Sequence, residues 1–508
     1  MENQYNNETN RDEETSPPVS PLSQSFNSTT ISLIIFVVIE LETPVTESEA
    51  LELLRSHLVP QNIRFSSIME QDKEGVLRWK KVDVQMEDHL IVPRFPIGLT
   101  RESYDEHLRE YLSKIGCEKF SDSKPLWEVH LVNYPSLNGA CTGIFKFSHA
   151  LGDGYSFMRV FFNCCVRADK SSSPLTFPRL SLMKTQQYDG NPVIGSGKKL
   201  FGLIQKCMNT SYDIMESLLR RACFEDQPSA IRSATSENMK IELFKPFNIH
   251  SVTLSLERVK QVKTKLGATV NDVIVGLLSY IIHLYGVRKM KMDNMDQYGE
   301  DGSTMNSING GTKKSMTMCV MLNMRIFKGF TNIEDMIRAD AWGNHSRLLF
   351  IPLPSYTNLE EVNPLEFIIK AKHHMDRKKN SMYFYLIDTL LKAAMWAKGQ
   401  KGIDEMLYSS FRNTSTMMTS VIGPKEQMAI TNHPVSSFYY FVSGIPQSIT
   451  FTSVSCMEQL KLVVTMEKGF IDSKLFVSCM DEAFENIFQA AFRNHPGGDD
   501  NQITNKSS

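Results

Sequence analysis

The chain has 508 residues and 42% hydrophobic content, which is enough for two globular domains of ordinary size, each with its own core. Its net charge is −2 and its basic residues are dispersed, which argues against a nucleic-acid-binding protein. The nine cysteines show no C-x-x-C pair and no regular spacing, so neither a zinc site nor a disulfide framework is indicated.

Residues 1–24 are rich in Asn, Glu, Ser and Pro, a composition that predicts a disordered segment. This polar, acidic start lacks the basic region and apolar core of a signal peptide. The longest apolar runs, Ile31–Leu41 and Val273–Leu284, are much shorter than the roughly 20 residues that cross a bilayer. We therefore predict a buried strand and a buried helix here and no membrane-spanning helix, while a helix lying on a membrane surface stays an alternative.

Hydrophobic patterning predicts several elements before residue 126. Thr46 and Glu49 form the T-x-x-E pattern of a capping box, and the apolar spacing of the ALELLRSHL run that follows fits one face of a helix. The predicted elements are the strand Ile31–Glu40, the helix after Thr46, the strands Ile63–Met69 and Val76–Val84, and the amphipathic helix Arg101–Ile115.

A predicted hairpin delivers a histidine to the end of a strand. Leu126–Tyr134 alternates strongly, turn residues follow, and the next strand ends at Ser148. Because side chains alternate along a strand, Ser148 and His149 are expected to point to opposite faces. A turn carrying Asp153 comes next, and Ser156 is expected to cap the apolar helix that follows.

His149 and Asp153 form an H-x-x-x-D pattern whose turn contains Gly152 and Gly154. A neutral imidazole titrates near pH 6.5, so His149 is able to accept the proton of an alcohol that attacks a carbonyl group. The simpler alternative is a hydrogen-bonded core histidine and a turn aspartate, because so short a pattern recurs by accident. A metal site at these two residues has little support, since no further ligands are grouped nearby.

Residues 186–197 are rich in turn residues and predict a loop, and Lys198–Arg221 predicts one amphipathic helix. The apolar residues that share one face of this helix are Leu200, Phe201, Ile204, Met208, Met215, Leu218 and Leu219. One interpretation is a helix that covers its own domain. The other is a helix that lies on a membrane surface.

A second unit is expected to begin near Phe244, after a domain boundary at residues 235 and 236. Asn271 and Asp272 open the predicted helix Val270–Gly286, where such a pair often caps the helix. Residues 288–314 predict a mobile loop. The other predicted elements are the strands Val252–Leu256, Met316–Asn323, Trp342–Pro354, Thr414–Lys425, Ser448–Val454 and Leu460–Thr465, the helices Leu256–Leu266, Leu365–Met375, Ser381–Ala397 and Ser473–Phe492, and a flexible tail at 495–508.

Nine ordered blocks between Ser20 and Asn494 carry a resemblance to a known family. These blocks are SPLSQSFNS, RFSSIM, KPLWEVHLV, SHALGDGYS, LTFPRL, EDQPSAIRS, KTKLGATVNDVIVG, AWGNHSRLLFIPLP and VIGPKEQM. Together they are similar to the plant bifunctional wax ester synthase/diacylglycerol acyltransferase family of the CoA-dependent acyltransferase superfamily. Nine blocks in order are far more specific than one motif.

The resemblance implies roles for individual residues. The family's H-H-x-x-x-D-G motif matches here with Ser148 in place of the first His, and it implies that His149 is the general base. Asp153 and Gly154 would support the base structurally. The departure at Ser148 weakens the match without abolishing it.

Further site residues follow from the same resemblance. Asn271 and Asp272 match the family's N-D motif, and Arg325 matches an arginine that pairs with the motif aspartate, here Asp153. Ser420 stands where the family usually has Asn in S-N-V-x-G-P. Asn271 and Ser420 are candidate donors to the oxyanion of the reaction.

The implied fold is α/β (α+β), with two chloramphenicol-acetyltransferase-like domains at 25–235 and 236–494. Each would be a mixed sheet flanked by helices, with the active site in the channel between them. The implied activity is transfer of a fatty acyl group from acyl-CoA, as cosubstrate, to a long-chain alcohol or diacylglycerol. No permanently bound cofactor, metal or nucleic-acid partner is expected, and the implied location is the cytosolic face of the endoplasmic reticulum membrane or the plasma membrane.

Two other classes stay in view. A related plant acyltransferase group shares H-x-x-x-D but carries D-F-G-W-G, which is absent here, and neither a G-x-S-x-G elbow nor a P-loop occurs. The chain could also be a catalytically silent acyl-CoA or lipid binder of the same fold, with Ser148 and Ser420 marking the loss of activity.

Overall fold

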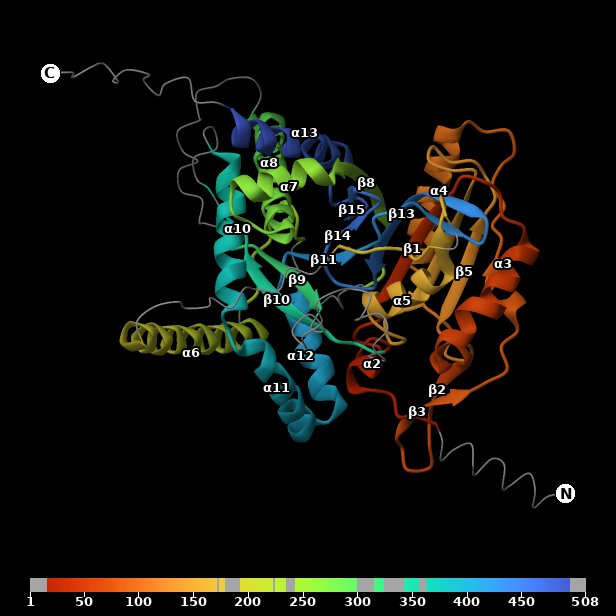
Figure 1. The fold of residues 1–508 in the computed structure, drawn as a ribbon, viewed down its shortest axis with the longest axis horizontal. Coiled ribbons are helices and arrows are strands. Elements are labelled where there is room, and N and C mark those ends of the chain that lie inside the picture. Colours follow the sequence, from red (N-terminus) through yellow and green to blue (C-terminus); the bar gives the residue numbers. More distant parts are fainter. Residues whose placement is uncertain are drawn as a thin grey trace.

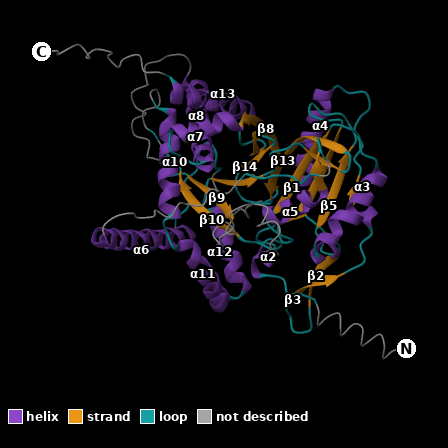
Figure 2. Ribbon diagram, in the orientation of Figure 1, coloured by secondary structure: helices purple, strands orange, loops and turns teal. Residues whose placement is uncertain are grey.

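The computed structural model describes residues 16–170, 173–178, 192–222, 224–233, 243–298, 315–323, 342–354, 356 and 362–493. Within these ranges two sheets meet, each with helices packed against it (Figures 1 and 2). The α/β class expected from the sequence is confirmed, since mixed sheets and helices make up both halves.

The first sheet has seven strands in the order β4-β5-β6-β1-β13-β12-β7. Their bounds are β4 Leu90–Ile91, β5 Trp127–Val132, β6 Cys141–Ser148, β1 Ile34–Leu41, β13 His433–Ser443, β12 Met428–Ile430 and β7 Cys165–Arg167. The helices of this part are α2 Pro21–Ser25, α3 Glu47–Leu53, α4 Arg101–Gly116 and α5 Gly154–Cys164, beside a hairpin of β2 Ser67–Gln71 and β3 Leu77–Lys81. Short helical turns cover Leu54–Leu58, Val59–Gln61, Ile63–Ser66 and Met86–Asp88.

The second sheet has six strands in the order β10-β9-β11-β14-β15-β8. Their bounds are β10 Ser346–Pro352, β9 Thr317–Asn323, β11 Thr416–Ile422, β14 Ile449–Cys456, β15 Gln459–Glu467 and β8 Phe247–Ser255. The accompanying helices are α6 Pro192–Ala222, α7 Leu256–Lys265, α8 Val270–Tyr298, α10 Pro364–Lys379, α11 Tyr383–Lys398, α12 Gln400–Arg412 and α13 Ser473–Phe492.

The apolar strand β1 is buried on both faces because helices and the second sheet cover it. Ile35 and Val37 belong to the core cluster that includes α5, whereas Phe36 and Val38 belong to a cluster with α4 and strand β8. The second of these clusters contains Phe247, Ile249 and Val463 of the second sheet. The two halves therefore share a hydrophobic core.

Strands from late in the sequence complete the first sheet. β13 pairs antiparallel with β1 (Phe36 opposite Phe441), and β12 joins β13 to β7. Neither β12 nor β13 was among the predicted strands, and helix α12 was not predicted either. Residues 236–494 thus supply part of the sheet that contains β1. The predicted boundary at 235 lies within 234–242, outside the described residues.

The disordered segment predicted for 1–24 is wrong for residues 16–24. The backbone N–H of Trp79 donates to Pro17 (3.0 Å) and that of Val19 to Leu77 (2.8 Å), which adds this stretch to the β2–β3 hairpin. Ser20 then caps α2, which has a proline in its first turn. Residues 1–15 and the predicted tail at 495–508 lie outside the described residues.

Three other expected elements also differ. The loop expected at residues 186–197 is wrong from Pro192 onward, where α6 begins. The strand expected at Ile63–Met69 begins as a helical turn, because Asn62 caps Ile63–Ser66 and only Ser67 onward pairs. The mobile loop expected at 288–314 is wrong for residues 288–298, since α8 continues to Tyr298. Arg288 pairs with Glu482 of α13 (2.5 Å), and Lys289 pairs one turn along the helix with Asp293 (2.8 Å).

Helix α8 is the one helix of the described part that could cross a membrane by length and composition. Its stretch Val270–Met295 has a mean hydropathy of 1.5 in its most apolar window, yet 67% of that window is buried inside the protein. Helices of a protein core pass the same test. Packing against α10 and α13 accounts for the apolar surface of α8.

Candidate active site

His149 lies at the end of a central strand, as the hairpin predicts. β6 ends at Ser148, which pairs with Ile34 of β1, and the backbone N–H of His149 donates to Leu33 (2.9 Å). The hydroxyl of Ser148 accepts the N–H of Ala150 (3.3 Å), so this side chain serves the turn. The imidazole is consequently held by a strand on one side and a hydrogen-bonded turn on the other.

The side-chain amide of Asn344 orients the imidazole. Its Nδ2 donates to the backbone oxygen of His149 (2.9 Å) and to Oγ of Ser23 (3.2 Å), which leaves Oδ1 facing Nδ1 of His149 at 2.8 Å. An amide oxygen only accepts, so Nδ1 must carry the proton. In the neutral ring, Nε2 therefore keeps a lone pair with which to accept a proton.

Burial sets the charge state of this ring. His149 is 3% exposed, and its ring lies 4.6 Å from that of Phe26, centroid to centroid. Burial lowers the pKa of His149 below its usual 6.5, against the raising effects of Asp153 and of the Asn344 hydrogen bond. The imidazole is neutral at pH 7 and able to act as a base.

Asp153 fastens the turn to the start of α5. Its Oδ1 accepts the backbone N–H of Ser156 (3.1 Å), so Asp153 caps the helix. The expectation that Ser156 is the cap is wrong, because its hydroxyl instead lies 3.1 Å from Asp153 Oδ1 and 3.2 Å from the oxygen of Gly343. The second carboxylate oxygen accepts the N–H of His345 (2.8 Å).

Residues 342–345 come from the second half of the chain and hydrogen-bond to the turn that follows β6. We call this turn, from His149 to Asp153, the histidine turn. The indole N–H of Trp342 donates to Leu151 (2.7 Å), and the N–H of Gly343 donates to Ser156 (3.2 Å). We expected a strand from Trp342 onward, but β10 begins only at Ser346. Gly343 has φ +132°, which favours glycine, and the Gly-Asn pair in W-G-N-H was the signal for this turn.

The structure adds Arg64 to the site, whereas Arg325 lies outside the described residues. Nη1 of Arg64 donates to the oxygen of Leu151 (2.8 Å). Burial lowers the pKa of Arg64 to about 10, and the negative charge of Asp153 opposes that shift. A half-buried cation therefore stands near the Asp153 carboxylate, and the pairing of Arg325 with Asp153 stays a prediction.

Asp272 and Asn271 lie at the start of α8. Oδ2 of Asp272 accepts the N–H of Thr269 (2.7 Å), and Thr269 Oγ1 accepts the N–H of Asp272 (3.2 Å), which is reciprocal capping. Lys379 lies 3.8 Å from the other oxygen of Asp272, and Asn271 is exposed. Among the described hydrogen bonds and ion pairs, none connects these two residues with His149.

Ser420 lies on β11, close to the start of α5. A Cβ added to Gly154 would lie 3.5 Å from Cγ2 of Val421, the residue after Ser420. Since side chains alternate along a strand, Ser420 points to the face opposite Val421. The structure thus brings Gly154 and β11 together and leaves the role of Ser420 a prediction.

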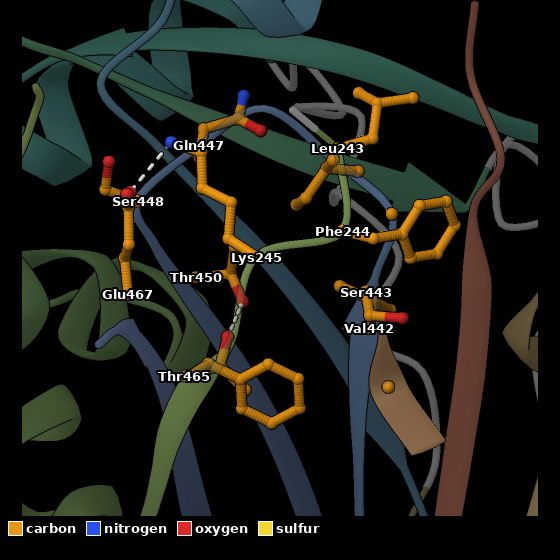
Figure 3. A pocket seen from close by; sticks show the side chains of 14 residues that line it. Leu243, Phe244, Lys245, Val442, Ser443, Gln447, Ser448, Thr450, Thr465 and Glu467 are labelled. Atoms are coloured by element: carbon orange, nitrogen blue, oxygen red, sulfur yellow. Dashed lines mark hydrogen bonds and ion pairs between the residues drawn. The ribbon is translucent and has the colours of Figure 1, made fainter. Parts of the chain in front are cut away.

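A pocket also lies where the sheets meet (Figure 3), and its lining residue Ser443 pairs with Ile34 of β1, which in turn pairs with Ser148. It is lined by Gly116, Leu243, Phe244, Lys245, Phe247, Val442, Ser443, Gly444, Ile445, Gln447, Ser448, Thr450, Thr465 and Glu467. Lys245 and Glu467 form an ion pair at its wall (2.9 Å), and the hydroxyls of Thr450 and Thr465 are 2.5 Å apart. None of the predicted site residues lines it. Across the described ranges, no three His, Cys, Asp or Glu residues are grouped to hold a metal ion.

Comparisons with known proteins agree on one family. Residues 51–274 match the model of the wax ester synthase/diacylglycerol acyltransferase catalytic domain, and residues 342–488 match that of the WS/DGAT C-terminal domain. Wax ester synthase/diacylglycerol acyltransferase 11 of Arabidopsis thaliana is 27% identical over 466 residues, covering 89% of this chain and 90% of the relative. Wax ester synthase/diacylglycerol acyltransferase 7 of the same plant is 26% identical over 434 residues, covering 82% of this chain and 86% of the relative.

Solved structures share the fold. The wax ester synthase/diacylglycerol acyltransferase from Marinobacter aquaeolei VT8 superposes with a TM-score of 0.56 at 13% identity, covering 93% of this chain and 99% of that one. A starter condensation domain of rhizomide synthetase RzmA, in complex with C8-CoA and Leu-SNAC, gives 0.52 at 11% identity, covering 94% and 95%. With the histidine turn at the end of β6 and both family models matched in order, the chain belongs to the wax ester synthase/diacylglycerol acyltransferase family of acyltransferases.

Proposed function

We propose that this chain transfers a fatty acyl group from acyl-CoA to a long-chain alcohol, to diacylglycerol, or to both, with His149 as general base. One observation carries the proposal: the 2.8 Å contact between Nδ1 of His149 and Oδ1 of Asn344, which leaves Nε2 as the proton acceptor. Burial keeps the ring neutral at pH 7.

The proposed step is a direct displacement. The substrate hydroxyl gives its proton to Nε2 of His149 while its oxygen attacks the thioester carbonyl carbon, which forms a C–O bond and a tetrahedral oxyanion. The C–S bond then breaks, and the departing sulfur takes the proton from the imidazolium to give CoA thiol and an ester. Asn271 and Ser420 are the proposed oxyanion donors, of which Ser420 lies on the strand that passes the start of α5.

The substrate classes rest on the names of relatives. The family and its Arabidopsis members are named for wax ester and diacylglycerol acyl transfer, and the fold relative RzmA is in complex with C8-CoA. Both proposed acceptors and the fatty chain partition into membranes, so we place the reaction at the cytosolic face of the endoplasmic reticulum or plasma membrane. Acyl-CoA acts as a cosubstrate, and no permanently bound cofactor is proposed.

Product analysis tests this function. Purified protein is incubated with palmitoyl-CoA and either hexadecanol or diacylglycerol, and the lipids are separated. We expect a palmitoyl ester of at least one acceptor, together with an equal amount of free CoA thiol. Thiol release without ester would indicate a hydrolase, and full recovery of palmitoyl-CoA with both acceptors would overturn the proposal.

Replacing Asn344 tests the orientation of the base. In Asn344→Ala the ring loses the acceptor that fixes its tautomer, and kcat is expected to fall by up to about 10²–10⁴-fold, the full contribution of a general base. Asn344→Asp keeps an acceptor beside Nδ1 and adds negative charge, which raises the pKa of His149. The acid limb of its pH–rate profile should therefore move to higher pH. A profile of Asn344→Asp identical to that of the wild type would remove Asn344 from this role.

A further inference from the structure

Helix α6, Pro192–Ala222, extends from the rest of the protein at the edge of Figure 1 and contacts α10, α11 and α12 only toward its C-terminal end. Its 31 residues make it about 46 Å long. The apolar face found in the sequence suggested two positions, against the domain core or against a membrane. The contacts of the helix distinguish between them.

The polar face of α6 is the face that packs against the protein. Asp213 is 1% exposed and pairs with Lys378 (2.8 Å) and Arg377 (3.2 Å) of α10, and Glu216 pairs with Lys378 (2.5 Å). Ser217, also 1% exposed, lies 2.7 Å from the hydroxyl of Tyr383 of α11. These ion pairs and this hydrogen bond hold the helix to the body, together with the partly buried Ile214, which packs against the core of the second half.

The apolar face of α6 points to solvent. We call its exposed residues the apolar stripe, and they follow the three- and four-residue spacing of one helix face. They are Phe201 (69% exposed), Ile204 (50%), Met208 (68%), Met215 (58%) and Leu218 (48%). The interpretation that this face covers its own domain is therefore wrong for these five residues, while Leu219, near the C-terminal end, is half-buried. An amphipathic helix with its apolar side outward leaves an unmatched hydrophobic surface.

We propose that the apolar stripe lies in the surface of a membrane that contains anionic phospholipid. Residues 192–212 contain three lysines (Lys198, Lys199 and Lys206) and no acidic residue, and both acids of the helix are held by Arg377 and Lys378. The outer part of α6 thus offers only positive charge, which suits anionic headgroups.

A second copy of the chain fits this surface less well. The stripe runs from Phe201 to Leu218, about 26 Å of a single helix, and its five residues are far fewer than the roughly 20–30 that each side of a stable protein interface supplies. The helix also extends away from the body, so a partner would meet little else (Figure 1). The membrane proposal rests in part on the proposed function, because fatty acceptors reside in bilayers.

Vesicle flotation tests the proposal with a matched pair of variants. The full chain is mixed with vesicles of phosphatidylcholine and phosphatidylserine at roughly 7:3, and the bound fraction is measured. Phe201→Ser with Met208→Ser should lower the partition coefficient by at least about tenfold, since two large apolar side chains no longer enter the interface. The matched control is Ile97→Ser with Leu137→Ser, two residues that are 93% and 52% exposed. Ile97 lies four residues before α4, and the N–H of Leu137 donates to Asp105 of α4 (3.2 Å), a helix on the side of the molecule opposite α6 (Figure 1).

The control pair should bind like the wild type, and vesicles of phosphatidylcholine alone should bind the wild type more weakly. Equal binding by the stripe and control pairs would overturn the proposal. A different result would also overturn it: light scattering finds a dimer of the wild type, the stripe pair is monomeric, and neither binds vesicles. The apolar stripe would then be covered by a second copy of the chain. Flotation needs no turnover, so absence of ester from palmitoyl-CoA with both hexadecanol and diacylglycerol would refute the proposed function and leave the flotation result readable.

Discussion

Replacing His149 with Ala is expected to lower kcat by about 10²–10⁴-fold, because the hydroxyl then has no positioned base. The loss should appear in kcat more than in KM, since in the proposed reaction Nε2 takes the proton in the transition state. His149→Gln is the matched variant. Its side-chain amide is able to donate to Asn344 Oδ1 in place of Nδ1 and largely keeps the contact with Phe26, but it cannot accept a proton at neutral pH.

The pH dependence has a definite sign. Burial lowers the pKa of His149 below 6.5, so the neutral ring that acts as base persists to a lower pH than in a free histidine. The acid limb of the pH–rate profile should therefore lie at a lower pH than the limb of an unshifted imidazole, and the rate should fall as pH drops through the lowered pKa. The same shift opposes folding in acid, because the unfolded chain binds a proton at His149 that the folded chain excludes, so stability declines as pH falls from about 6.5 to the lowered pKa. Both replacements of His149 should abolish this contribution.

Two outcomes would contradict the assignment. If His149→Gln turns over at the wild-type rate while its melting temperature is unchanged, the imidazole is not the base. If His149→Ala loses activity and His149→Gln regains it, the residue is a packing and hydrogen-bonding element of the turn. Circular dichroism of each variant separates loss of chemistry from loss of fold.

Asp226→Ala is expected to lower the free energy of unfolding by at least about 3–5 kcal/mol, the usual result of removing one member of a buried ion pair. Asp226 is 3% exposed and lies 3.3 Å from Arg220 at the end of α6. Its carboxylate also accepts the backbone N–H and hydroxyl of Thr317 (2.6 and 3.0 Å) and of Ser415 (3.0 and 2.7 Å). Thr317 opens β9 and Ser415 directly precedes β11. The alanine variant therefore takes the acceptor from three buried donors, while the N–H of Ser415 keeps the oxygen of Thr317 (3.0 Å) and Arg220 keeps Glu216 (3.8 Å).

Urea unfolding followed by circular dichroism measures this effect. Asp226→Asn keeps one acceptor oxygen and should fall between the wild type and Asp226→Ala. Asp169→Ala is the surface control, since Asp169 pairs with Arg167 at 2.7 Å but its side chain is 59% exposed, and little change is expected. If Asp226→Ala and Asp169→Ala unfold at the same urea concentration, the three elements α6, β9 and β11 are held together by contacts other than those of Asp226.

Local patterns in the sequence predicted much of the fold because they report on short-range physics. The capping box of Thr46 and Glu49 is present, and Gly267, with φ +57°, follows the end of α7 as expected. Alternation placed β5 and β6, and their short connection made them a hairpin that ends just before His149. Elements of this kind depend on neighbours a few residues away, so the chain itself carries their signal.

The pairing of β13 with β1 and the contacts of residues 342–345 with the histidine turn depended on partners that are distant in the sequence. β13 pairs with β1 across about four hundred residues of sequence, and no pattern in either strand identifies the other as its partner. Asn344 reaches His149 only because residues 342–345 turn before β10 begins, and the Gly-Asn pair indicates a turn without indicating which residue that turn contacts. The orientation of the imidazole was therefore not readable from the H-x-x-x-D pattern.

The sequence by itself determined the family, the strand end that presents His149 and the presence of an apolar face on α6. Tertiary structure decided which nitrogen of His149 is free, which residue caps α5 and which face of α6 is outward. The physical reason is the same in each case: a side chain's chemistry is local, whereas its charge state, hydrogen-bond partner and exposure depend on groups that only folding brings near it.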